Sequence, residues 1–466
     1  MSSERSASHG GRRRPHATAR MMLLLVVLLA ASCGTRLTQH EIAIRAGSTG
    51  GSGGTAGTAG AAGVGSGGSA STATGTPGAV PGKATGAGGA TTVTAAGIEA
   101  GAKGAAAPAK AAPIIIGTVA NLSGPAGAAQ RPGVLAVQAW VQAINARGGI
   151  NGHPIVHIVR DDGSDPARNA AAVQDLVENR GVIAFVGNFV SQSGQGAAAY
   201  LAKRGIPVVG GDATTSLWYQ NPMFFPQTVD NGKTQGAALK TLASLIGGRN
   251  LGTLVCQEAQ VCAEGETAFN QAAAAAGWSV KYNGKGSLVQ PDYTANCLAA
   301  RSAHVDVLGI VFDGPSTKRI ARSCSDQGFK PRYVLAAVDT TYASPDFEGS
   351  VLAGLVFPFV GSGLPAAAEF EKTMARYAPN EPLGVVTATG WTAAKLFEAV
   401  AQGVGATPTT ADILNGLYAL KGETLGGLTV PLTFHRGAPA TPVPCAFMMV
   451  ISGGRFTAPN GAKPTC

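Results

Sequence analysis

Residues 181–214 read Gly-Val-Ile-Ala-Phe-Val-Gly-Asn-Phe-Val-Ser-Gln-Ser-Gly-Gln-Gly, then an Ala-rich stretch, then Gly-Ile-Pro-Val-Val-Gly-Gly-Asp-Ala-Thr. Val182–Gly187 and Ile206–Gly210 are short apolar runs, which is typical of strands buried on both faces. Gln195–Arg204, between them, has the composition of a helix. A strand, a helix and a strand of these lengths predict a βαβ unit, so we expect the two strands to be parallel.

Both predicted strands end in polar turns, which cover residues 188–194 and 211–216. In an open α/β sheet such turns lie side by side at the carboxyl ends of the strands, where ligands bind. Ser191 and Ser193 precede a predicted helix start, and the hydroxyls and free N–H groups of such a place favour a carboxylate or another anion. The alternative is that these serines only cap the helix.

A length of 466 residues allows two or three domains. The distribution of charge along the chain excludes a nucleic-acid surface. The formal charge is +9, but residues 1–32 hold five arginines and one glutamate, and residues 33–112 hold five basic and two acidic residues. Most of the excess positive charge therefore precedes residue 113, and the remainder is too balanced for binding nucleic acid.

The first 32 residues have the pattern of a lipoprotein signal peptide. Arg12, Arg13, Arg14 and Arg20 precede residues 21–31, an apolar run too short to span a bilayer as a helix, as in a secretory signal. The run ends in Leu-Ala-Ala-Ser-Cys-Gly, which resembles the lipobox of bacterial lipoproteins. We therefore expect Cys33 to carry the lipid and the protein to be anchored on the outer face of the cell membrane. Ordinary cleavage after a small residue is the alternative.

Residues 33–112 are predicted to be a flexible, disordered tether, because a segment dominated by Gly, Ala, Thr and Ser cannot bury a core. The composition changes at Pro113, where predicted apolar strands and amphipathic helices begin to alternate. Strands are expected at 114–119 and 154–160, and helices at 133–147 and 166–180. Asp165 is the expected N-cap of the last of these helices. This alternation predicts a doubly wound parallel sheet.

Six cysteines remain when Cys33 is set aside, and exported proteins form disulfides. Local spacing suggests the pairs Cys256–Cys262, Cys297–Cys324 and Cys445–Cys466, one of fifteen possible connectivities. Zinc is the alternative, but no Cys-x-x-Cys pair occurs and no histidine stands at ligand spacing. We expect neither a metal nor a cofactor.

Four motifs follow one another in fixed order, beginning at Ile116 (Ile-Gly-Thr-Val-Ala-Asn-Leu-Ser-Gly-Pro), Ile144 (Ile-Asn-Ala-Arg-Gly-Gly-Ile-Asn-Gly), Arg160 (Arg-Asp-Asp-Gly-Ser-Asp-Pro) and Gly205 (Gly-Ile-Pro-Val-Val). They closely resemble the type I extracytoplasmic solute-binding proteins for leucine, isoleucine and valine. The resemblance implies two doubly wound α/β lobes joined by three crossovers. Lobe 1 is expected at 113–231 plus 358–428, and lobe 2 at 232–357 plus 429–466, with strands at 428–434 and 446–451.

The resemblance also implies a ligand site. In the family, a serine after the third strand and a threonine after the fourth hold the carboxylate and amino groups of an amino acid. These positions match Ser191 and Thr214, with Asp212 supplying a backbone carbonyl between them. The second lobe departs from the family: Cys262 and Asp313 stand where the family has tyrosines. A family glutamate that meets the ligand ammonium falls near Ala337 or Asp339.

Two interpretations of this departure stay open. Asp313 or Asp339 takes over the ammonium of an amino acid, or the ligand is instead an amide, a short peptide fragment or a polyol. Asp313 has a third interpretation, as a turn residue or helix N-cap before Pro315.

The sequence therefore predicts a lipid-anchored binding protein that captures a small amino-acid-like molecule and delivers it to an ABC-type permease. The alternative is a sensor domain whose closed form signals to a membrane partner. An enzyme is not expected, because Ser191 lacks the Gly-x-Ser-x-Gly elbow of a serine nucleophile.

Overall fold

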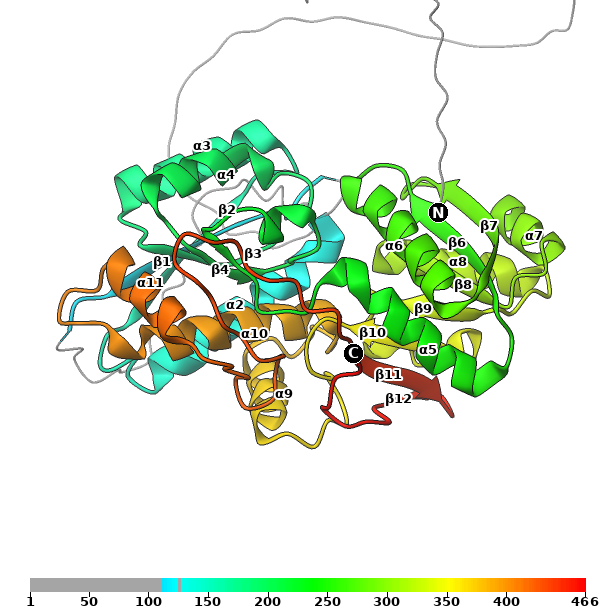
Figure 1. Cartoon of the computed structure of the whole chain (residues 1–466). Coiled ribbons are helices and arrows are strands. Elements are labelled where there is room, and N and C mark those ends of the chain that lie inside the picture. The colour runs from blue at the N-terminus through cyan, green and yellow to red at the C-terminus, as the bar shows by residue number, and fades with distance from the viewer. Residues whose placement is uncertain (1–110, 125–126) are drawn as a thin grey trace, which may run out of the picture. The chain divides into compact units, whose positions relative to one another are not determined.

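The computed structural model describes residues 111–124 and 127–466 (Figure 1). The predicted signal peptide, Cys33 and all but the last two residues of the predicted tether lie outside the described residues. The expectations for them therefore stay predictions.

The first sheet is entirely parallel, with the strand order β2-β1-β3-β4-β5. Its strands are β1 (Ile114–Ala120), β2 (Ile155–Asp161), β3 (Ala184–Asn188), β4 (Val208–Gly211) and β5 (Phe224–Phe225). The strands predicted from residues 181–214 are β3 and β4, and they are parallel neighbours with Phe185 opposite Val208. The βαβ prediction is confirmed.

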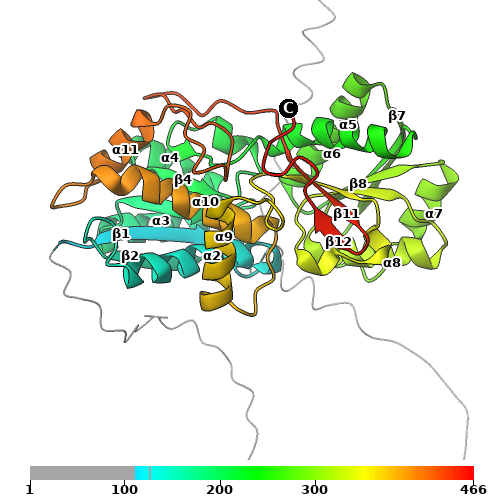
Figure 2. The ribbon, with the colours of Figure 1, turned by 90° about the horizontal axis from the view of Figure 1, so that it is seen from below.

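Helices cover both faces of this sheet, as a doubly wound fold requires. α3 (Pro166–Arg180) and α4 (Gln195–Arg204) pack on one face; α2 (Gly127–Ala146) and α10 (Val385–Val400) pack on the other (Figures 1 and 2). Trp140 of α2 and Trp391 of α10 are fully buried, and Phe185 and Leu201 are buried on the α3–α4 side. α9 (Pro365–Tyr377) contacts α2, and α11 (Thr410–Ala419) contacts α10.

The second sheet has the order β12-β11-β10-β9-β8-β6-β7. Its strands are β6 (Asn250–Cys256), β7 (Ser279–Gly286), β8 (Val307–Val311), β9 (Arg332–Leu335), β10 (Val351–Gly354), β11 (Phe447–Ser452) and β12 (Arg455–Thr457). The five strands from β7 to β10 are parallel, whereas β11 and β12 are antiparallel to their neighbours. The lobe is therefore a parallel sheet with an antiparallel edge, which is common in α/β folds.

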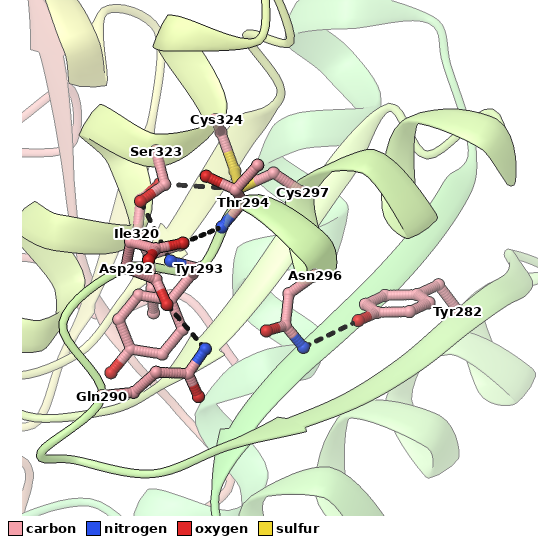
Figure 3. The surroundings of a disulfide bond; sticks show 10 residues. All are labelled: Tyr282, Gln290, Asp292, Tyr293, Thr294, Asn296, Cys297, Ile320, Ser323 and Cys324. Atoms are coloured by element: carbon pink, nitrogen blue, oxygen red, sulfur yellow. Dashed lines mark hydrogen bonds between the residues drawn. A yellow bond between two sulfur atoms is a disulfide. The ribbon is translucent and has the colours of Figure 1, made fainter. Parts of the chain in front are cut away.

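The second lobe is also covered on both faces. α5 (Thr234–Ile246) and α6 (Gln260–Ala276) share one apolar core, while α7 (Thr294–Ser302) and α8 (Gly314–Asp326) pack together elsewhere on the sheet. Disulfides are present at the three predicted pairs. Figure 3 shows the bond between Cys297 and Cys324, which joins α7 to α8. Beside it, the N–H of Tyr293 donates to Ser323 Oγ at 3.0 Å.

Three chain segments pass between the lobes, and hydrogen bonds tie them to one another. The N–H of Val229 donates to Leu355 O at 3.1 Å, the N–H of Phe357 donates to Leu428 O at 3.0 Å, and the N–H of Asp230 donates to Val443 O at 3.0 Å. The connections are thus a bundle of adjacent backbone segments, and the predicted three crossovers are confirmed.

Some element predictions are wrong. Residues 428–434 form no strand; Leu432 makes an isolated bridge with Glu423, and Phe434 packs edge-on against Phe225, whose ring also contacts Tyr418. The pattern was apolar enough for a strand, but its partners are side chains rather than a neighbouring strand. α2 begins at Gly127, six residues before the predicted start, and contains Pro132, which removes one backbone donor without ending the helix. β5 and α11 were not predicted.

Candidate functional site

The turns after β3 and β4 lie together, as predicted, because the N–H of Asp212 donates to Asn188 O at 3.1 Å. Ser191 stands in the first turn and is 8% exposed. Its hydroxyl oxygen accepts a hydrogen bond of 3.0 Å from Gln130 Nε2, near the start of α2. The structure therefore joins Ser191, Asp212 and Thr214 at one sheet edge, with α2 beside them.

Ser193 points away from this group and into the lobe. Its hydroxyl is fully buried; it donates to Asp162 Oδ2 at 2.6 Å and accepts from Asn121 Nδ2 at 2.8 Å. Asn169 Nδ2 also donates to Asp162 Oδ2, at 2.8 Å. These bonds compensate the buried Asp162 carboxylate. Ser193 thus ties the β3 turn to the β1 and β2 turns.

Asp212 has a buried carboxyl group, and one of its two oxygens has no hydrogen-bond partner among the described residues. It is 3% exposed, and Trp218 Nε1 donates to its Oδ1 at 3.0 Å. Oδ2 has no hydrogen-bond partner within the part of the chain that the structure describes. Burial raises the pKa of Asp212 to about 7, while Trp218 and the nearby N–H groups of Val190, Ser191 and Thr214 lower it in part. None of those N–H groups reaches hydrogen-bond geometry at Oδ2.

Thr214 repeats this feature two residues later. Its Oγ1 is buried and has no hydrogen-bond partner among the described residues. Between the two side chains, Ala213 has φ 45°, a left-handed conformation that is uncommon outside glycine. The β4 turn therefore holds two unsatisfied polar groups on a constrained backbone. Buried polar groups in proteins are nearly always paired, so this arrangement fits a polar ligand.

Asp313 and Asp339 follow the second sheet's strands β8 and β9. Asp313 Oδ1 accepts from the N–H of Ser316 at 2.9 Å and caps α8, so the N-cap interpretation is confirmed. Asp339 Oδ1 accepts from the N–H of Thr341 at 2.8 Å and also from the Thr341 hydroxyl. The pKa of Tyr342 is raised mainly by burial and further by the negative charges of Asp339 and Asp313. Both carboxylates are therefore near the same phenol. Both are partly exposed.

Cys262 opens α6 and is bonded to Cys256 at the end of β6. The disulfide closes the turn between them, in the place where the resemblance led us to look for a ligand-contacting tyrosine. Two residues later, Glu264 Oε1 accepts a long hydrogen bond of 3.4 Å from Ser216 Oγ of the first lobe. Gln260 Nε2 also donates to Glu264 Oε1, at 2.6 Å. The disulfide thus links the end of β6 to the first turn of α6, and Glu264 of α6 contacts the first lobe beside the β4 turn.

The periplasmic binding protein family model matches residues 113–455, most of the chain. This chain belongs to that family. Periplasmic binding proteins bind small solutes outside the cytoplasm and are not enzymes, as predicted. No curated protein matches the chain.

Solved structures of other periplasmic binding proteins share this fold at low sequence identity. A possible leucine/isoleucine/valine-binding protein from Rhodopirellula baltica is 18% identical, covers 76% of this chain and 98% of its own, and has a TM-score of 0.65. A fatty acid ABC transporter substrate-binding protein from Thermomonospora curvata is 18% identical, with coverages of 75% and 92% and a TM-score of 0.63. A branched-chain amino acid transporter protein from Streptococcus pneumoniae, in complex with isoleucine, is 19% identical, with coverages of 74% and 98% and a TM-score of 0.62.

Sequence reasoning missed Asn121, Asp162, Gln130 and the Trp218 bond to Asp212. The available signal was the polar pair at 161–162 directly after a strand, in a chain where charges are sparse. The described residues contain no cluster of three metal-ligating side chains, and none of their helices is long and apolar enough to cross a membrane.

Proposed function

We propose that this periplasmic binding protein is lipid-anchored and captures a small amino-acid-like solute for an ABC-type importer. The observation that carries the proposal is the pair of buried, unpartnered atoms, Asp212 Oδ2 and Thr214 Oγ1. A buried donor or acceptor without a partner costs about 1–3 kcal/mol. A solute with matching polar groups removes that cost when it binds.

In this proposal Ser191, Asp212 and Thr214 hold one end of the solute, and Asp313 and Asp339 receive its ammonium group from the second lobe. Ser193 supports the first lobe's site through Asp162 and Asn121 rather than by contact. The hydrogen bonds found for Asp313 and Asp339 use Oδ1 in each case. Capping therefore orients these carboxylates and is compatible with a charge contact to the solute.

Closure of the two lobes is the proposed mechanism. The three connecting segments form a hydrogen-bonded bundle, and hinges of this kind absorb the backbone rotation of domain closure. The solute then bridges the β3–β4 edge of one lobe and the β8–β9 edge of the other. An importer distinguishes the loaded protein from the empty one by the closed arrangement.

The ligand assignment is tested by thermal unfolding of the protein with a panel of amino acids, their amides and sugars. A bound solute at a hundred times its Kd adds about 2.7 kcal/mol to the free energy of unfolding. We expect stabilisation by at least one amino-acid-like member, and we expect Thr214→Ala to reduce it. Stabilisation by sugars alone, or a shift that Thr214→Ala leaves unchanged, contradicts the assignment.

The anchor is tested separately. Cys33 is the proposed lipid attachment site, and Cys33→Ala is expected to move the protein from the membrane fraction to the soluble extracytoplasmic fraction. An unchanged distribution contradicts lipid attachment at Cys33.

A further inference from the structure

We propose that the first lobe of this protein binds a neutral group that both donates and accepts hydrogen bonds, a primary carboxamide in place of a carboxylate, and that Asp212 makes this choice. The inference rests on the proposed function, because it names the chemistry of the solute that the same site takes. It narrows that function to amino-acid amides and related carboxamides.

The Asp212 carboxyl group lies at the place where the resemblance puts the solute. The N–H groups of Val190, Ser191 and Thr214, in the two turns at the carboxyl edge of the first sheet, are near enough to lower its pKa, although none of them forms a hydrogen bond to Oδ2. The resemblance assigns these turns to a solute carboxylate. In this chain a carboxyl group of the protein itself already faces the same N–H groups, and a second carboxylate there meets its negative charge at short range in a buried place.

The second step is the pair of atoms left unsatisfied. Above about pH 7 Asp212 is ionised and its Oδ2 only accepts hydrogen bonds, whereas the Thr214 hydroxyl both donates and accepts. A primary carboxamide matches the pair, since its N–H donates to Asp212 Oδ2 and its oxygen accepts from Thr214 Oγ1. A carboxylate has no donor for Oδ2 and leaves that atom unpaired, which sites of this kind reject strongly.

The third step is that Asp212 is fixed. Trp218 Nε1 holds Oδ1, and the Trp218 ring is buried and packs edge-on against Phe224 at a centroid distance of 5.2 Å. The carboxyl group therefore cannot turn to solvent when a solute arrives without breaking a buried hydrogen bond. Its position is a property of the folded lobe.

The test measures the binding of matched acid and amide pairs to the full-length protein by calorimetry at pH 8. The probes are leucine and leucinamide, phenylalanine and phenylalaninamide, and 4-methylpentanoate and 4-methylpentanamide. We expect the wild-type protein to bind at least one amide at least tenfold more tightly than its acid. Asp212→Asn keeps an acceptor for Trp218 and supplies a donor, so it is expected to shift that ratio at least tenfold towards the acid.

Asp165→Asn is the matched control. It makes the same chemical change in the same lobe at a partly exposed helix cap, where Asn is as good as Asp, and it is expected to leave the ratio unchanged. Thermal unfolding of both variants checks that they are folded, and Asp212→Glu replaces Asp212→Asn if that variant does not fold. The glutamate variant displaces the carboxylate and is expected to weaken binding of the amide at least tenfold.

The outcomes separate the inference from the proposed function. Tighter binding of acids by the wild type, with a ratio that Asp212→Asn does not change, overturns the inference and leaves the amino-acid-binding function standing. Binding of none of the six probes by the wild type or by Asp212→Asn overturns both.

Discussion

The two sheet edges that carry the candidate site use their carboxyl groups in opposite ways. In the first lobe Asp212 is buried, is held by a tryptophan and keeps one oxygen without a partner. In the second lobe Asp313 and Asp339 are partly exposed, and each caps a helical turn. The disulfides of the described residues also all lie in the second lobe. One edge thus keeps buried polar atoms without partners, while the carboxylates at the other edge accept hydrogen bonds from their own backbone.

The largest effect on stability is expected at Asp212, the buried carboxyl group of the first lobe. The pKa of this group is raised from 3.8 to about 7, so the folded protein holds a proton between these values that the unfolded chain has released. Stability therefore falls as the pH rises from about 4 to about 7 and stays lowered above that range. Asp212→Asn removes the titration and is expected to raise the free energy of unfolding at pH 8 by on the order of 4 kcal/mol.

The measurement is solute-free denaturant unfolding of the wild type and Asp212→Asn at pH 4 and pH 8. The gain should be small at pH 4, where the folded group is protonated and the unfolded group is close to its own pKa of 3.8. An equal gain at both pH values contradicts a buried titrating carboxyl group.

The second prediction concerns the disulfides of the second lobe. The Cys297–Cys324 bond has a sequence separation of 27. A disulfide that closes a loop of that size stabilises the folded protein by roughly 3–4 kcal/mol. Replacing both cysteines by alanine should lower the free energy of unfolding by that amount. Hydrogen exchange should accelerate in α7 and α8 while α3 and α4 stay protected. Equal acceleration in both lobes contradicts the view that the lobes are separately stabilised.

The third prediction is at Thr214. Thr214→Val keeps the shape and removes a hydroxyl that has no partner, so we expect solute affinity to fall about tenfold or more without loss of stability. Thr389→Val is the control, because that hydroxyl bonds to Val385 O within α10 and should not affect affinity. A stability loss without an affinity change would place the Thr214 hydroxyl in the lobe's own structure. Calorimetry and thermal unfolding separate the two results.

The smallest expected effect is at Asp313. Asp313→Asn retains the cap and should change stability by less than about 0.5 kcal/mol, whereas Asp313→Ala should cost about 1 kcal/mol. Both should weaken binding of an ammonium-bearing solute only a few-fold, because water screens a partly exposed charge. Affinity that is identical in all three proteins would assign Asp313 to capping alone.

Much of the fold could be predicted from the sequence because the signals are local. The buried strands and the helix of residues 181–214, and the Asp165 cap with its 2.8 Å bond from the N–H of Arg168, depend on residues a few positions apart. Local spacing also pointed to the disulfide pairs. The strand expected at 428–434 failed because its apolar side chains pack on residues such as Phe225.

The roles of the polar residues were decided by tertiary structure. Ser193 was expected to face a ligand, yet its partners Asn121 and Asp162 lie 72 and 31 residues away and draw it into the lobe. Asp212 was expected to contribute only a backbone carbonyl, yet burial leaves its carboxyl group beside the candidate site. The sequence by itself determined which segments form strands, helices and caps, since periodicity and capping act over a few residues. Which polar atoms are paired and which remain open depends on groups that only the packed lobes bring together.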